Sequence, residues 1–240
     1  MRSRSGRGRN HILLEISDDD TSMFDGELAI IARSSFGFDT IRMGYDVAIP
    51  LVPENRNASV YKAAIESNIT SRPLLFFFQG SMTTKFPAQL VGLHDPARGQ
   101  VSIVTGVLGA ANERDFQESM VHARFALTVI GQGRHTYRLL ESLAAGAIPV
   151  IISDDWMLPF HDEISWVTCA VFIPQHRVLD VPRILRAISD EEAGKRATAC
   201  AQIQDSHFSE WTYASAAILM LEYLERRFRS IEPPLTITVL

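Results

Sequence analysis

The sequence has few cysteines, no long apolar run and no excess of positive charge. Cys169 and Cys200 are too few for a disulfide framework or a cysteine metal site, so we interpret both as ordinary thiols. The apolar run at residues 74–78 is far too short to span a bilayer. A net charge of −5 over 240 residues argues against general attraction to nucleic acid or to anionic membranes.

What is present is ordinary for a globular protein. Hydrophobic residues make up 46% and charged residues 21%, enough to build a core in one large domain or two small ones. The opening stretch MRSRSGRGR is basic and lacks the apolar centre of a secretory signal, so we expect residues 1–9 to be a disordered leader. The triplets Asn57-Ala-Ser and Asn68-Ile-Thr match the glycosylation motif, which is compatible with a secretory lumen without demonstrating one.

Strand and helix patterns alternate after residue 72. We expect strands at 74–81, 100–106, 125–131, 147–153 and 170–174, and helices at 113–123, 136–145, 180–189 and 213–228. This order predicts a parallel sheet with helices on both faces. Before residue 72 we expect strands at 11–16 and 46–53 and a weak helix at 26–36.

The helix predicted at 136–145 follows a strand directly, which points its first turn toward the carboxyl ends of the strands, where such sheets bind ligands. Arg138 lies in that turn and Arg134 just before it, and arginine suits bidentate phosphate contact. Glu141 shares the helical face of Arg138 and can accept from ribose hydroxyls. The pattern indicates a nucleotide-sugar site, although a solvated surface pair has the same spacing.

Other polar residues allow two interpretations. Thr136 can donate to a phosphate or cap the helix. His11, Asp46 and the acidic turn 18–20 are candidates for a group near an acceptor hydroxyl, but we favour structural roles for all of them. No metal-binding motif is present in the sequence.

The segment RLLESLAAGAIPVIISDDWMLPFHDEISW resembles the signature region of exostosin-type glycosyltransferases, which polymerise heparan sulfate in animals. The segments GRNHILLEI, GYDVAIPLVP, RPLLFFFQGS and DFQESMVHARFALTVIGQGR also occur in that family, in the same order and with similar gaps. The resemblance therefore covers residues 8–228.

The resemblance implies an α/β fold, with a Rossmann-like donor-binding domain of a GT-B-type glycosyltransferase and a truncated remnant of the acceptor-side domain. After the leader, residues 10–55 are the expected remnant, 56–72 a connection, 73–228 the nucleotide-sugar-binding domain and 229–240 a tail. Because partner strands for the remnant are not evident in the sequence, we expect it to pack incompletely.

The resemblance also implies a donor-nucleotide site. We expect it to contain Gly80, Ser81, Arg134, Thr136, Arg138, Glu141, Asp155 and Trp156. For Trp156, the sequence supports stacking on a base or sugar and a packing role equally well. Met157 stands where many members have glutamate, and the segment before Gly131 lacks their PRG triplet.

The expected function is transfer of a sugar from a UDP-sugar to a glycan or glycoprotein acceptor, with inversion and with no cofactor or metal. The resemblance implies a location in the Golgi or another secretory lumen and a possible hetero-oligomer with a related transferase. The alternative is a catalytically silent exostosin-like binding or partner module, or a partial gene product. No nucleic-acid partner is expected.

Overall fold

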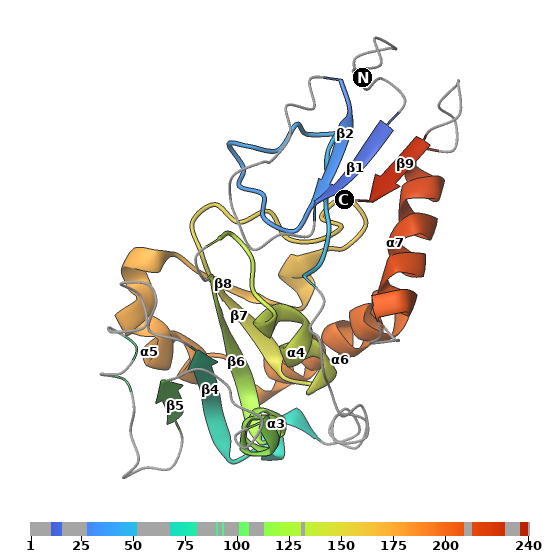
Figure 1. Cartoon of the computed structure of the whole chain (residues 1–240). Coiled ribbons are helices and arrows are strands. Elements are labelled where there is room, and N and C mark those ends of the chain that lie inside the picture. Colours follow the sequence, from blue (N-terminus) through green and yellow to red (C-terminus); the bar gives the residue numbers. More distant parts are fainter. Residues whose placement is uncertain are drawn as a thin grey trace.

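The computed structural model describes residues 11–15, 28–51, 68–80, 90, 93, 101–105, 113–130, 133–208, 213–228 and 236–239. Two parallel sheets, with helices packed around them, form the described part of the molecule (Figure 1). The expected α/β fold is thus confirmed. The predicted leader, Asn57 and Ser81 lie outside the described residues. No helix within the described ranges is long and apolar enough to cross a membrane.

The larger sheet has the order β5-β4-β6-β7-β8, and every pairing in it is parallel. Its strands are β4 Leu74–Gly80, β5 Val101–Thr105, β6 Ala123–Val129, β7 Ile148–Ile152 and β8 Val171–Ile173. All were expected from the sequence. The chain runs outward from β4 to β5, then crosses back to β6 on the other side of β4. The order therefore reverses between β4 and β6, and such a switch point is where open α/β sheets bind ligands at the carboxyl ends of their strands.

The connections and the C-terminal half supply the helices. They are α3 Glu113–Val121, α4 Arg138–Ala144, α5 Val181–Arg186, α6 Asp190–His207 and α7 Tyr213–Phe228, with short 3-10 helices η2 Ile69–Ser71, η4 Trp166–Thr168 and η5 Gln175–Asp180. Helix α6 was not expected from the sequence. Its start is nevertheless marked in the sequence, because Ser189 caps the first turn by accepting from the backbone N–H of Glu192, and acidic residues follow.

Strands β4, β6 and β7 of the larger sheet are buried on both faces, which explains their largely apolar character. Phe76 and Phe78 of β4 point to the face covered by α5 and the start of α6. Phe77, between them, points to the other face and packs against Phe116 and Met120 of α3. The three phenylalanines are therefore core on alternating sides.

The smaller sheet has the order β3-β2-β1-β9, again parallel throughout. Its strands are β1 His11–Glu15, β2 Ile30–Arg33, β3 Val47–Ala48 and β9 Thr236–Val239. The helix predicted for residues 26–36 is wrong, since these residues supply β2, whose backbone pairs with β1 and β3 on either side. The expected tail also differs. The long helix α7 leads back to the smaller sheet, where residues 236–239 pair with β1 (Figure 1).

The two sheets share one hydrophobic core. Val47 and Ile49 of the smaller sheet region are 0% exposed, and they share a hydrophobic cluster with Leu139 and Leu143 of α4. The expected incomplete packing of the N-terminal part is therefore not seen where it is described, because α4 and β9 provide partners from distant parts of the chain.

The interpretation of the two cysteines as ordinary thiols is wrong. Cys169 and Cys200 form a disulfide that joins the end of η4 to the middle of α6, and both residues are buried. They lie 31 residues apart in the chain. Only the packing of α6 against the segment of η4 brings them together, so spacing in the sequence did not reveal the bond.

Candidate functional site

Arg138 lies at the carboxyl end of the larger sheet, as the sequence predicted. It is the first residue of α4, which follows β6. Its Nε donates to the carbonyl oxygen of Gln79, near the end of β4, at 2.8 Å. Its guanidinium carbon lies 4.5 Å from the ring centroid of Phe116 in α3, a cation–π contact. These contacts hold Arg138 at the switch point between β4 and β6.

Glu141 forms a salt bridge with Arg138 across one turn of α4. The side chain of Glu141 is 1% exposed and that of Arg138 is 15% exposed, so this is not the solvated surface pair that the same spacing allows. Removing one partner of a buried ion pair leaves the other charge poorly compensated, which is strongly destabilising. The carboxylate of Glu141 therefore fixes the guanidinium beside β4.

Thr136 and Gly80 lie next to this pair. The hydroxyl of Thr136 accepts from the backbone N–H of Arg138 at 3.3 Å, so it helps to form the start of α4. Gly80 is the last residue of β4. A Cβ added at Gly80 would come within 2.8 Å of the Phe78 ring, which explains the choice of glycine at this strand end.

Arg134 belongs to a second cluster, where the two sheets meet. Its Nε donates to Oδ2 of Asp155 at 2.8 Å, and its backbone N–H donates to Oγ of Ser35 at 2.9 Å. Asp39 lies 3.7 Å from the same guanidinium. A Cβ added at Gly37 would lie 2.8 Å from Arg134 Nε, so the close approach requires glycine there. Arg134 thus bridges the loop after β2 and the loop after β7.

Trp156 is a packing anchor in this structure. It is 5% exposed and belongs to the core shared by the two sheets. Its backbone pairs with Gly37 in an isolated bridge, and the next residue, Met157, donates to the carbonyl oxygen of Phe36 at 2.8 Å. A base or sugar has little of this ring to stack on.

The described site residues therefore fall into two groups. Gly80, Thr136, Arg138 and Glu141 gather at the end of β4, whereas Arg134, Asp155 and Trp156 gather between the sheets. Sequence reasoning did not identify the residues that hold the two arginines: Gln79, Phe116, Ser35 and Asp39. No sequence pattern links them to the arginines, because they lie on other elements than the arginines do.

Asp46 has the structural role that the sequence analysis favoured. It is 1% exposed and accepts from the backbone N–H groups of Ile31 and Arg42, each at 3.0 Å. The side chain of Arg42 donates to the same carboxylate. This hydrogen bond is the main reason that the pKa of Arg42 is raised.

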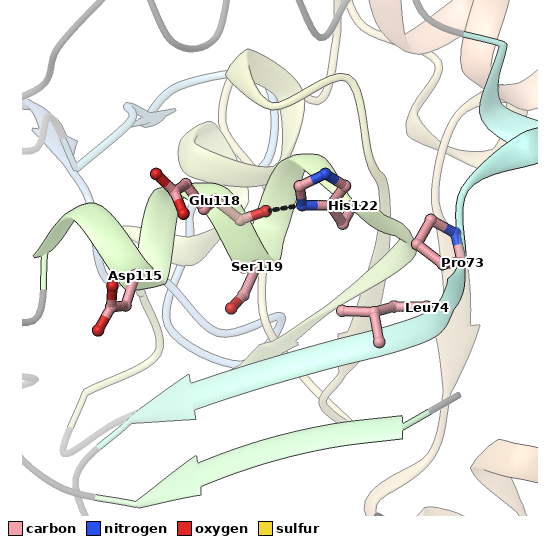
Figure 2. A pocket seen from close by; sticks show the side chains of 6 residues that line it. All are labelled: Pro73, Leu74, Asp115, Glu118, Ser119 and His122. Carbon is pink, nitrogen blue, oxygen red and sulfur yellow. Dashed lines mark hydrogen bonds between the residues drawn. The ribbon is translucent and has the colours of Figure 1, made fainter. Parts of the chain in front are cut away.

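A pocket of about 540 Å³ lies at the end of the larger sheet that is opposite to Arg138 (Figure 2). Its lining consists of Pro73, Leu74, Asp115, Glu118, Ser119 and His122. These residues come from the start of β4 and the exposed side of α3, whereas Arg138 lies at the end of β4. Asp115 and Glu118 make the pocket acidic, which does not suit a nucleotide diphosphate. Within the described residues no group of three or more His, Cys, Asp or Glu is placed to hold a metal ion.

Comparison with known proteins identifies related sequences. The family model described as the Exostosin GT47 domain matches residues 3–188. Exostosin-1 of Drosophila melanogaster is 28% identical over 218 residues, which cover 77% of this chain and 28% of that protein. The Exostosin-1 homolog of Caenorhabditis elegans is 24% identical over 251 residues, covering 89% of this chain and 64% of that protein. The chain thus spans less than two thirds of either relative.

Among solved structures, the chain is similar to WaaG, a glycosyltransferase involved in lipopolysaccharide biosynthesis. The TM-score is 0.45 and the sequence identity 13%, over 81% of this chain and 64% of that one. This likeness is too distant to carry an argument about the site.

Proposed function

Because the chain belongs to the family of the Exostosin GT47 domain, we propose that it transfers a sugar from a UDP-sugar donor to a glycan or glycoprotein acceptor. The two parallel α/β lobes suit the GT-B-type architecture that the family resemblance implies. The observation that carries the proposal is the placement of Arg138 at the carboxyl end of β4, beside the switch point, with Glu141 holding it.

The proposed reaction is a single displacement with inversion. An acceptor hydroxyl attacks the anomeric carbon and releases its proton to a base or to water, and the bond from that carbon to the diphosphate oxygen breaks on the opposite face. Negative charge then grows on the leaving UDP. A guanidinium fixed in advance stabilises this charge without reorganisation, which is the role we propose for Arg138. Arg134 and Thr136 complete the proposed diphosphate contacts, with Gly80 at the end of β4 and Asp155 bonded to Arg134.

The role proposed for Glu141 follows from its burial. With 1% of its side chain exposed and its carboxylate on Arg138, its main task is to orient that guanidinium. A ribose contact, which the sequence first suggested, requires the buried carboxylate to become accessible to the ligand. The two roles differ in one measurable respect: a ribose contact serves uridine as well as UDP, whereas orientation of Arg138 serves only ligands with phosphate.

We place the protein in the secretory lumen, in keeping with the family resemblance. The disulfide between Cys169 and Cys200 supports this location, because such bonds persist mainly in oxidising compartments. The family resemblance also suggests assembly with a related transferase. Pull-down of such a transferase by the tagged chain from luminal extracts tests this part of the proposal.

A second candidate function is a catalytically silent module that binds nucleotide or supports an active partner. The observation that favours it is that Arg134 and Arg138 are both already bonded to carboxylates. Release of UDP from UDP-sugars in the presence of glycan acceptors separates the two functions, since a silent module binds UDP without turnover.

The test of donor binding is calorimetric titration of UDP and uridine into the parent, Arg138→Ala and Glu141→Gln. A charge-assisted hydrogen bond contributes about 1.5–3 kcal/mol, so Arg138→Ala should weaken UDP binding by roughly 10- to 150-fold and leave uridine unchanged. Glu141→Gln should weaken UDP less and spare uridine. Since no resident metal is proposed, EDTA should not alter UDP binding by the parent.

Arg183→Ala is the matched control, because Arg183 also pairs with an acidic residue three positions away but is 69% exposed. Melting curves check that each variant is folded. A parent that fails to bind UDP would refute the proposed function. If Arg138→Ala binds UDP like Arg183→Ala, the Arg138–Glu141 pair has a structural role only. A loss of uridine affinity in Glu141→Gln would instead assign Glu141 to the ribose.

A further inference from the structure

The triplet Asn68-Ile69-Thr70 forms a turn that is buried at Ile69 and exposed at Asn68. Ile69 is 5% exposed and packs in the core of the larger sheet, whereas Asn68 and Ser71 are exposed. The following residue, Arg72, is buried and donates from its guanidinium to the carbonyl oxygen of Ala123 at 3.0 Å. The fold therefore holds Asn68 outward on a fixed support.

The side chain of Asn68 is oriented by its oxygen. Oδ1 accepts from the backbone N–H of Thr70 at 3.1 Å and from the Thr70 hydroxyl at 2.9 Å. The backbone of Asn68 is extended, with φ −64° and ψ 117°. Both hydrogen bonds that Asn68 forms through its side chain with described residues thus use Oδ1 and not Nδ2, the nitrogen that carries the sugar in N-linked glycans.

A second observation concerns the compartment. The buried disulfide between Cys169 and Cys200 is typical of proteins that fold in an oxidising lumen, where asparagine-linked glycosylation also takes place. A large glycan is compatible with a fold only where the asparagine points to solvent. Asn68 meets the sequence requirement and the exposure requirement together.

We propose that Asn68 is a site of N-linked glycosylation. Nδ2 of Asn68 forms a bond to the anomeric carbon of an oligosaccharide that is linked to a lipid through a diphosphate. The bond from this carbon to the phosphate oxygen breaks, the lipid diphosphate leaves, and one proton of the amide nitrogen passes to a base of the glycosylating enzyme or to water. The proposal rests on the luminal location but not on transferase activity.

The test is expression of the full chain behind a cleavable secretory leader in cultured animal cells, followed by peptide N-glycosidase digestion. The parent should lose mass on digestion, and mass spectrometry should find Asn68 converted to aspartate. Asn68→Gln and Thr70→Ala should each remove one glycan. Thr70→Ser, which keeps the hydroxyl, should retain it, and Asn57→Gln separates the contribution of the other triplet.

Only secreted chains with the Cys169–Cys200 disulfide formed are analysed, so every product has passed through the lumen. An unmodified Asn68 in these chains would overturn the proposal. Equal glycan numbers in the parent and Asn68→Gln would also overturn it. Because UDP binding and sugar transfer do not enter the readout, failure here is distinguishable from failure of the proposed function.

Discussion

At the scale of single residues, buried charges are held by more than one partner. Arg138 contacts a carboxylate, a strand carbonyl and an aromatic ring, each from a different position in the chain. Asp46 likewise accepts from two backbone N–H groups and from Arg42. Such satisfied groups order the loops around them, because an unpaired buried charge costs far more than an exposed one.

Asp46→Ala should destabilise the protein. The change removes the acceptor for the backbone N–H groups of Ile31 and Arg42, and we expect a loss of about 2–3 kcal/mol in the free energy of unfolding, since Arg42 itself is 40% exposed and partly solvated. Urea denaturation measures this loss. Asp180→Ala is the control, because Asp180 pairs with Arg177 and Arg183 in solvent, and its removal should change little. Equal effects of the two changes would contradict the role assigned to Asp46.

At the scale of elements, α6 is fastened to the segment that follows β7. The disulfide joins its middle to Cys169, and the guanidinium of Arg196 donates to the carbonyl oxygens of Ala170 at 2.7 Å and Val167 at 3.1 Å. The same segment carries Trp166, whose indole N–H donates to Pro159 at 2.8 Å. The covalent bond and the hydrogen bonds thus hold one helix against one loop.

Loss of the disulfide should be costly. Closing a loop over a separation of 31 residues lowers the entropy of the unfolded chain, which corresponds to about 3–4 kcal/mol of stability. The variant Cys169→Ala/Cys200→Ala should show this loss in chemical denaturation under non-reducing conditions. The parent in reducing agent should denature at nearly the same midpoint as the variant. An unchanged midpoint in both would show that the bond contributes no stability.

At the scale of the whole molecule, the two sheets behave as one folded unit. Backbone hydrogen bonds cross between them from Phe38 to Asp155, from Met157 to Phe36 and from Phe160 to Ala48, at 2.8–3.0 Å. The shared core and the return of α7 to β9 add further links. The smaller sheet is therefore stabilised by elements from both halves of the chain.

Hydrogen exchange should reflect this arrangement. Amides of β1 and β2 should exchange about as slowly as those of β6 and β7, because all lie in paired and buried strands. Deleting residues 236–240 should speed exchange in residues 11–14, which lose β9, while residues 148–152 stay protected. Rapid exchange of β1 in the parent would show that the smaller sheet is incompletely packed, as the sequence alone suggested.

Local patterns in the sequence determined much of the larger sheet. Its strands are apolar runs ended by glycine, proline or polar residues, and they were predicted as strands from the sequence. For β4 the reason is that a strand buried on both faces needs a continuous apolar run. The start of α4 after β6 was also predictable, and with it the place of Arg138 at the carboxyl ends of the strands. The role of this residue in donor binding stays a prediction.

Tertiary structure decided the rest, because the deciding contacts join residues far apart in the chain. Residues 30–33 form a strand since β1 and β3 flank them, although their local spacing favoured a helix. Residues 236–239 are a strand because α7 returns them to β1. Cys169 reaches bonding distance of Cys200 only after helices pack on the sheet. The contacts of Arg138 with Gln79 and Phe116 depend on the same packing. Spacing along the chain carries no information about such contacts, since strand pairing and side-chain packing are non-local.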